Sequence, residues 1–190
     1  EHEITVTAGG TEALFCAIQS VLRAGDEVIT LEPAYDSYEP SVTLAGARTV
    51  RVPLGRPDFH VDWQRVDDAV TPRTRLLIVN TPHNPSGAAW TAADLEQCAA
   101  LVARHGLYLL ADEVYEHIVF DGREHMSMLR NPVLAARSFV VSSFGKTYHT
   151  TGWKIGYAIA PRELTAEFRK VHQFVQFSVF TPAQYALAEY

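Results

Sequence analysis

Short apolar runs alternate with amphipathic stretches along the whole chain. Seven runs rich in β-branched residues predict strands, and several are apolar almost throughout, as strands covered on both faces are. They are Ile4–Thr7, Glu27–Leu31, Arg48–Val52, Arg75–Asn80, Leu107–Asp112, Ser138–Ser143 and Ile155–Ala160. Because strands and helices alternate, the pattern predicts a mainly parallel sheet with right-handed crossovers, an α/β layer architecture.

The segments between the predicted strands carry helix signals. Apolar residues recur at helical spacing over residues 14–22, and Gly25 is expected to end this helix as a C′ glycine. Thr91 with Asp94 three residues later resembles a capping box, and the helix that it opens is expected to stop at Gly106.

Composition narrows the class of protein. Of the 190 residues, 47% are hydrophobic and 20% are charged, which is typical of a globular protein long enough to bury a sizeable core. The formal net charge of −6 gives no basic footprint, so we expect neither nucleic acid nor a membrane surface as partner. Cys16 and Cys98 lie far apart in apolar helical patterns, which favours core packing in a reduced, cytoplasmic setting.

The ends of the chain indicate a piece of a longer protein. It begins at Glu1 without a methionine and stops at Tyr190 inside a predicted helix, TPAQYALAEY. No run of eighteen apolar residues and no signal-peptide pattern occurs.

In parallel α/β sheets ligands bind at the carboxyl ends of the strands, and polar residues follow four of the predicted strands. The first end runs through Gly9, Gly10 and Thr11 into a helix, where backbone N–H groups and the helix dipole favour a phosphate. Such turns are also common as purely structural features. The pattern is not G-x-G-x-x-G, so a dinucleotide fingerprint is absent.

The second and third strand ends supply an aromatic ring and an amide. Tyr35 can lie flat over a planar ligand or pack as a half-buried aromatic. Asn84 precedes Pro85, which restricts its backbone to extended geometry and holds its side chain in place. We interpret His83 as a loop histidine, because no second histidine or carboxylate stands around it at metal-ligand spacing.

The fourth strand end delivers a carboxylate. Asp112 closes a buried apolar run, and burying a lone carboxylate is costly enough that a cationic or proton-sharing partner is expected. A protonated ring nitrogen would serve. Tyr115, three residues later, can present its hydroxyl to the same region.

One lysine stands in the stretch SSFGKTYHTTGW, and three interpretations of it compete. Lys146 can be a solvated loop lysine, the end of a P-loop, or an amine held beside a cofactor aldehyde. The P-loop motif requires glycine at the position of Val140, which excludes the second interpretation. Together with Ser143 and Lys146, the four strand ends supply an anion cradle, a stacking ring, a carboxylate and an amine, the set that pyridoxal 5′-phosphate requires.

Three motifs resemble the class I and II aminotransferases, which belong to the fold-type I pyridoxal-phosphate enzymes. They are Asp112-x-x-Tyr115, Asn84-Pro85 and SFGK followed by TGWK, and the likeness spans nearly the whole chain. The resemblance implies a three-layer αβα fold with a mainly parallel sheet, in which residues 1–190 form the single large cofactor-binding domain. An N-terminal segment and a C-terminal small domain are expected outside this chain. EPAYDSYEP, NTPHNPSG and SSFGKTYHTTGWKIGY are most similar to the methionine aminotransferase group.

The resemblance also implies roles for residues around the cofactor ring. Lys146 is expected to be the catalytic residue, which forms the Schiff base and moves the proton. Asp112 is expected to pair with the pyridinium nitrogen, and Tyr115 and Asn84 to contact the phenolic oxygen. Asn84 is also expected to bind substrate, and Tyr35 to stack on the ring.

A second group is expected to bind the cofactor phosphate: Gly10, Thr11, Ser143 and Lys154. The family often has arginine at the position of Lys154. Lysine keeps the charge but lacks the bidentate fork, so a point-charge contact with the phosphate is expected.

The implied activity is transfer of an amino group between an L-amino acid, of methionine, aromatic or similar apolar type, and a 2-oxo acid, by a homodimer. The family's carboxylate-binding arginine lies in the small domain, outside this chain. Tyr35, Tyr38 and Tyr148 indicate either an apolar substrate pocket or ordinary packing. Two alternatives remain open, a cysteine-conjugate β-lyase on the same scaffold and an aminotransferase-like regulatory module that senses the cofactor.

Overall fold

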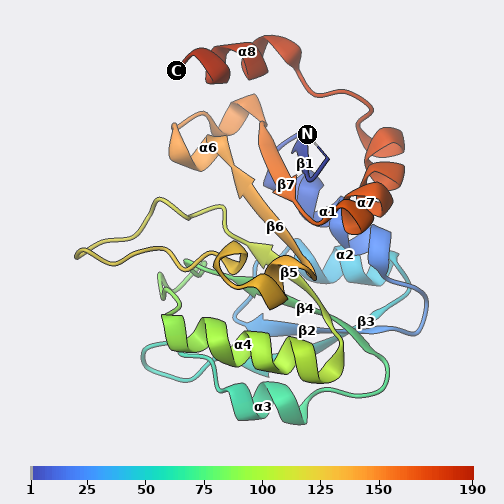
Figure 1. Ribbon diagram of the computed structural model, residues 1–190, viewed down its shortest axis with the longest axis vertical. Coiled ribbons are helices and arrows are strands. Elements are labelled where there is room, and N and C mark those ends of the chain that lie inside the picture. Colours follow the sequence, from blue (N-terminus) through green and yellow to red (C-terminus); the bar gives the residue numbers. More distant parts are fainter. Residues whose placement is uncertain (1) are drawn as a thin grey trace.

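Seven strands form one sheet at the centre of the computed structural model, which describes residues 2–190 (Figure 1). Their order across the sheet is β1-β7-β6-β5-β4-β2-β3. The strands are β1 (Ile4–Thr7), β2 (Glu27–Glu32), β3 (Arg48–Pro53), β4 (Thr74–Asn80), β5 (Tyr108–Asp112), β6 (Ser138–Ser143) and β7 (Gly156–Ile159). All seven predicted strands are confirmed, with bounds that differ by at most one residue at either end.

The sheet is mainly parallel, as the strand-helix alternation predicts. The pairs β2–β3, β2–β4, β4–β5 and β5–β6 are parallel, whereas β7 runs antiparallel to both β6 and β1. The register places Asn80 beside Asp112, and Ser143 beside Gly156. The last residues of β4, β5 and β6 therefore lie at one end of the sheet, together with the first residue of β7.

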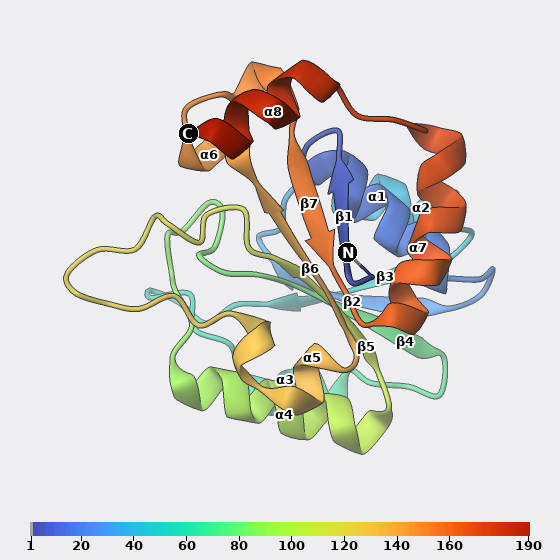
Figure 2. The same cartoon turned by 45° about the horizontal axis from the view of Figure 1, so that its top comes forward.

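Helices cover both faces of the sheet (Figures 1 and 2). On one face lie α1 (Gly10–Val21), α2 (Tyr38–Leu44) and α7 (Arg162–Val175), and on the other α3 (Trp63–Asp68), α4 (Ala92–His105) and α5 (Pro132–Ala135). Leu76 and Ile78 of β4 pack into the first layer, and Leu77 and Val79 pack into the second. This alternation divides the core into two apolar clusters and confirms the three-layer α/β fold.

Short helices complete the described part of the chain. They are η1 (Met128–Arg130), α6 (Phe144–Thr147), η2 (Thr151–Trp153) and α8 (Thr181–Glu189). The helix expected within TPAQYALAEY is α8, and it is present.

The two predicted helix ends have different outcomes. The capping box of Thr91 and Asp94 is confirmed, and Gly106 ends α4 in the left-handed region with φ of 65°. The prediction that Gly25 ends the first helix is wrong, because α1 stops at Val21 and Leu22 is already extended. Leu22 turns into the apolar core instead, and Gly25 lies in the following turn with φ of 90°.

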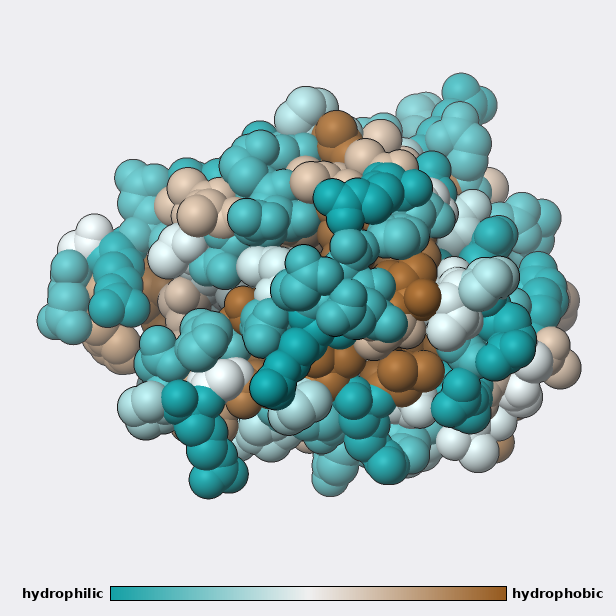
Figure 3. All heavy atoms as spheres, turned by 90° about the horizontal axis from the view of Figure 1, so that it is seen from below, coloured by the Kyte–Doolittle hydropathy of each residue, from teal (hydrophilic) through white to brown (hydrophobic). Residues whose placement is uncertain are grey.

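One face of the molecule is largely polar, with limited apolar areas. Figure 3 shows the molecule from below the view of Figure 1, with hydrophilic side chains over much of this face and apolar patches between them. Among residues 2–190 no helix combines the length and the apolar character needed to cross a membrane. Cys16 and Cys98 are unpaired and fully buried, which confirms their predicted place in the core.

Candidate active site

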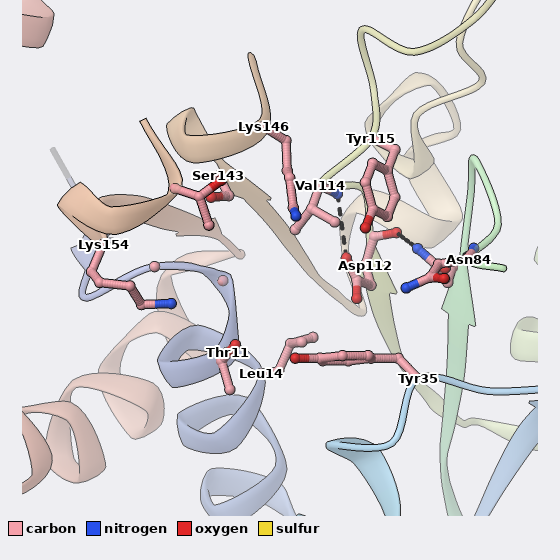
Figure 4. Close-up of a pocket in the computed structure, with 14 residues that line it drawn as sticks. Thr11, Leu14, Tyr35, Asn84, Asp112, Val114, Tyr115, Ser143, Lys146 and Lys154 are labelled. Atoms are coloured by element: carbon pink, nitrogen blue, oxygen red, sulfur yellow. Dashed lines mark hydrogen bonds between the residues drawn. The ribbon is translucent and has the colours of Figure 1, made fainter. Parts of the chain in front are cut away.

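A pocket opens where the carboxyl ends of β4, β5 and β6 meet the start of α1 (Figure 4). Its lining comes from every strand end that the sequence singles out. The lining residues are Gly9, Gly10, Thr11, Leu14, Tyr35, Asn80, Asn84, Asp112, Val114, Tyr115, Ser143, Lys146, Thr151 and Lys154. All nine predicted site residues are in this set, so the structure brings together residues up to 144 positions apart in sequence, from Gly10 to Lys154.

One side of the pocket is built to hold an anion. α1 begins at Gly10 directly after Gly9, whose φ of 82° lies in the left-handed region, and no side chain caps the free N–H groups of this helix start. A Cβ placed on Gly9 would lie 3.1 Å from Lys154 Nζ, so the ammonium group lies close above this turn. A helix N-terminus and a lysine side by side favour a phosphate.

The segment from β6 to β7 carries four of the lining residues into position. Ser143 is the N-cap of α6, and its hydroxyl accepts a hydrogen bond of 3.3 Å from the N–H of Gly145. The turn that follows is tightly packed, since a Cβ on Gly145 would lie 2.9 Å from the Cα of Thr151. The chain then reaches Lys154, which follows η2 with φ of 53° and directs its side chain towards Gly9.

Asp112 forms the opposite side of the pocket and is almost completely buried, with 3% of its surface exposed. Its Oδ2 accepts a hydrogen bond of 2.6 Å from the hydroxyl of Tyr38, and its Oδ1 accepts one of 3.3 Å from the N–H of Val114. Burial raises the pKa of Asp112 to about 6, although both hydrogen bonds act to lower it. The expected proton-sharing partner of this carboxylate is therefore present, and it is Tyr38.

The sequence predicts that Tyr38 either lines an apolar substrate pocket or packs in the core. In the structure it packs in the core and also donates the hydrogen bond to Asp112. It is buried behind Asp112, and its ring stands edge-on to Tyr35 with centroids 5.7 Å apart and planes at 82°. Burial and the neighbouring Asp112 charge raise the pKa of Tyr38 well above its ordinary value, so its hydroxyl keeps the proton that it donates. The signal for this residue was its place three positions after Tyr35, which brings both tyrosines to the same strand end.

Asn80 is a residue of the site that the sequence did not single out. Its amide Nδ2 donates a hydrogen bond of 2.8 Å to the backbone oxygen of Asp112, and its Oδ1 accepts one of 2.6 Å from the N–H of Asn84. Asn80 thus joins the third strand end to the fourth. A polar residue as the last position of an apolar strand was the signal that could have identified it.

His83 lies in the loop, as predicted, but it is buried and fixes that loop in place. Its Nε2 lies 2.8 Å from the backbone oxygen of Pro33, and its Nδ1 lies 2.6 Å from the hydroxyl of Ser86. Burial lowers the pKa of His83, which favours the neutral ring. Since Pro33 can only accept, the neutral ring donates through Nε2 and accepts through Nδ1. This histidine connects the loop of Asn84 to the turn that leads to Tyr35.

Lys146 extends from α6 into the space between the anion-binding side and Asp112. Its Nζ lies 5.7 Å from the ring centroid of Tyr115. Figure 4 shows Lys146 and Tyr115 pointing into the pocket from one side, and Thr11 and Tyr35 from the other. Val140 lies within β6, in agreement with the exclusion of a P-loop.

The order of groups across the pocket fits pyridoxal phosphate. A cationic helix start suits the phosphate, the buried carboxylate of Asp112 suits a protonated ring nitrogen, and the amine of Lys146 lies between them. The flat ring of Tyr35 lines the space that the pyridine ring would take. These donors match what this cofactor requires in charge and hydrogen bonding.

Comparison with known proteins gives consistent matches over the full chain. Residues 1–190 match the family model of aminotransferase class I and II. A methionine aminotransferase from Escherichia coli (strain K12) is 52% identical over 189 residues, which are 100% of this chain and 49% of that protein. A probable N-succinyldiaminopimelate aminotransferase from Mycobacterium tuberculosis (strain CDC 1551 / Oshkosh) is 44% identical over 191 residues, which are 99% of this chain and 48% of that protein.

A solved structure shows the same fold. The crystal structure of YbdL from Escherichia coli, reported with a methionine aminotransferase function, superposes with a TM-score of 0.96 at 53% identity. The match covers 98% of this chain and 50% of that one. The chain therefore spans about half the length of the relatives that it matches.

Proposed function

The chain belongs to the class I and II aminotransferases, which are pyridoxal-phosphate enzymes, and from this premise we propose that the full-length protein is itself such an aminotransferase. It moves an amino group between an L-amino acid and a 2-oxo acid. One observation of the structure carries the proposal. A lysine, a buried carboxylate and an anion-binding helix start line the same pocket, and they suit the cofactor's aldehyde, ring nitrogen and phosphate, respectively.

The proposed cofactor contacts follow from the geometry of the pocket. Asp112, already held by Tyr38, pairs with the ring nitrogen. Tyr35 lies against the face of the ring, and Asn84 and Tyr115 contact its oxygen. Four further residues bind the phosphate: Gly10, Thr11, Ser143 and Lys154.

The proposed chemistry divides between the cofactor and the chain. When bound, pyridoxal phosphate supplies an electron sink that makes the α-hydrogen of an amino acid acidic. Lys146 Nζ is the group of this chain that removes that proton and returns it, because it is the amine that reaches into the centre of the pocket. Asp112 keeps a proton on the ring nitrogen, since an ionised carboxylate this deeply buried requires a cationic partner.

We propose L-methionine and similar apolar or aromatic L-amino acids as amino donors. The support is the 52% identity to a protein named methionine aminotransferase, together with the apolar and aromatic lining from Leu14 and Tyr35. The relatives named above are all aminotransferases, which favours this function over a β-lyase or a regulatory module.

We further propose that residues 1–190 form the large domain of a homodimeric, cytoplasmic protein that also has an N-terminal segment and a C-terminal small domain. The chain spans about half of its relatives. Several large aromatic side chains from the last turn of α7 onward are exposed, which is consistent with coverage by further chain or by a second subunit. They are Phe174, Phe177, Phe180, Tyr185 and Tyr190. The two free, buried cysteines fit a reducing compartment.

The test is turnover by the full-length protein with pyridoxal phosphate, L-methionine and a 2-oxo acid acceptor. Formation of the oxo acid of methionine together with the amino acid of the acceptor is expected. Lys146→Ala should lower kcat by at least about 10²–10⁴-fold, the usual contribution of a general acid–base group. Lys170→Ala is the matched control, because Lys170 lies on the surface and pairs with Glu167.

Two results would contradict the proposal. Normal transamination by Lys146→Ala would show that another group moves the proton. Release of pyruvate from a cysteine conjugate, with no amino transfer to any 2-oxo acid, would assign the pocket to β-elimination instead.

A further inference from the structure

Three metal-ligating side chains meet between α1 and α7, outside the pocket. Glu12 and Cys16 stand four residues apart and so lie on one face of α1, and His172 comes from the last turn of α7. Glu12 Oε1 lies 2.8 Å from Cys16 Sγ and 3.0 Å from His172 Nδ1. All three ligand atoms lie within 4.8 Å of one another. Figures 1 and 2 both show α1 and α7 packed side by side.

The cluster is buried, and its members are held in orientation. Cys16 is fully buried, and the side chains of His172 and Glu12 are 11% and 10% exposed. The imidazole of His172 stacks on Phe168 with centroids 6.0 Å apart and an interplanar angle of 24°. Glu12 Oε2 accepts a hydrogen bond of 3.0 Å from the N–H of Ala8, so one carboxylate oxygen is fixed by the backbone and the other faces the cluster.

We propose that Glu12, Cys16 and His172 bind a thiophilic divalent cation, Zn²⁺ in the first place, with water as the fourth ligand. Thiolate, imidazole and carboxylate are the ligand types of protein zinc sites, and three protein ligands with one open position are a common arrangement. A thiolate ligand does not suit Ca²⁺ or Mg²⁺, which take oxygen ligands. The hydrogen bond from Ala8 to Glu12 supplies the outer contact that orients a ligating carboxylate.

The distances allow such a site with small side-chain shifts. Ligand atoms of a tetrahedral zinc site lie about 3.3–3.8 Å apart, as follows from metal–ligand bonds of about 2.0–2.3 Å. The separations of 2.8 and 3.0 Å from Glu12 Oε1 are slightly shorter, so the carboxylate has to move away by less than about 1 Å. Binding releases the thiol proton of Cys16 to solvent, and His172 ligates through Nδ1 with its remaining proton on Nε2.

The alternative is a hydrogen-bonded cluster in which Cys16 and His172 both donate to Glu12. The chain contains a matched comparison for it, since Asp94 and Cys98 repeat the same spacing on α4. Asp94 has no such histidine, because its Oδ1 accepts from Trp63 Nε1 at 3.1 Å and its Oδ2 accepts from the hydroxyl of Thr91 at 2.7 Å. A carboxylate and a cysteine four residues apart are therefore present twice, but among residues 2–190 only the first pair has the third ligand.

The site would fasten the start of α1 to the end of α7. Through the N–H of Ala8, the bound carboxylate also reaches the turn of Gly9 that enters the pocket. None of the three ligands lines that pocket, so the inference stands independently of the proposed function.

The test titrates the full-length protein, saturated with cofactor, with ZnCl₂ by calorimetry and with CoCl₂ by visible spectroscopy. One equivalent of Zn²⁺ is expected to bind, Co²⁺ should give the intense d–d bands of a tetrahedral thiolate site, and Zn²⁺ should raise Tm. Cys16→Ser should weaken Zn²⁺ binding by more than ~100-fold, since loss of an outer-shell contact alone costs about 10–100-fold, and His172→Gln should do the same. Cys98→Ser should leave affinity and spectrum unchanged.

The outcomes decide between the two arrangements. Unfolding in EDTA checks that Cys16→Ser and Cys98→Ser are folded without metal. Absence of stoichiometric Zn²⁺ binding by the wild-type protein would overturn the proposal, and so would equal binding by wild type and Cys16→Ser. If Cys16→Ser does not fold, His172→Gln decides alone, because its glutamine retains a neutral donor for Glu12 but not the imidazole ligand.

Discussion

Replacing Asp112 by asparagine should stabilise the cofactor-free protein near neutral pH. The carboxyl of Asp112 is buried, and its pKa is raised from 3.8 to about 6. In the unfolded chain the group ionises near its ordinary pKa, so between pH 3.8 and about 6 the folded state holds the proton more tightly than the unfolded state does. The stability due to this proton is complete below pH 3.8 and is lost as the pH rises through about 6.

The magnitude follows from the size of the shift. A rise of about two pKa units corresponds to about 3 kcal/mol, at about 1.4 kcal/mol per unit. Asparagine has nearly the same shape and stays neutral, so Asp112→Asn avoids this loss. The two proteins should have similar free energies of unfolding at about pH 4, and the variant should be more stable by up to about 3 kcal/mol at about pH 7.5.

Urea unfolding of both apoproteins across this pH range measures the difference directly. Taking the difference between variant and wild type removes the contributions of all other titrating groups, provided that their environments are unchanged. A difference that is independent of pH would refute the assigned environment of Asp112, as would a variant less stable than wild type at neutral pH. The same substitution should weaken the hold on a protonated ring nitrogen, so the cofactor-loaded variant should lose activity while its apoprotein gains stability.

Further predictions concern residues around the pocket. Tyr38→Phe removes a donor from the Asp112 carboxylate and should raise the pKa of Asp112 above about 6 by about one to two units, since a hydrogen bond to a charged group contributes about 1.5–3 kcal/mol. Carbon-13 NMR titration of the apoprotein measures this pKa, and an unchanged value would contradict the role of Tyr38. Gly156→Ala should destabilise the protein by about 1–3 kcal/mol and weaken cofactor binding, because its Cβ would lie 2.8 Å from the carbonyl carbon of Gly9. Gly152→Ala is its control in urea unfolding, since nothing lies within 4 Å of that Cβ, and equal effects of the two substitutions would contradict the packing argument.

The sheet could be predicted from the sequence because its strands are continuous apolar runs. A strand buried on both faces has few polar positions, so its ends are marked clearly by the first polar or turn residues. Asp112 and Ser143 were found in this way, as the last residues of β5 and β6. The end of α1 was not, because Leu22 leaves the helix to pack in the core, and such a tertiary contact overrides a local glycine signal.

Long-range hydrogen bonds account for what the sequence missed in the site. Tyr38 bonds to Asp112 across 74 positions, and no local pattern marks such a pair. Asn80 meets Asp112 only because β4 and β5 are neighbours in this register. Family motifs identified the residues that face the pocket, whereas the contacts behind them and the Glu12–His172 pair, 160 positions apart, required the three-dimensional structure.

Reduction by borohydride shows whether Lys146 is the amine that engages the cofactor. The full-length protein is saturated with pyridoxal phosphate, reduced, digested and analysed by mass spectrometry. The chain has three lysines within residues 1–190, Lys146, Lys154 and Lys170, which fall in separable peptides. We expect one pyridoxyl group per chain, attached to Lys146, and protection from labelling when L-methionine is added before reduction. Labelling of Lys154 or Lys170 instead, or no stoichiometric labelling of any lysine, would contradict it.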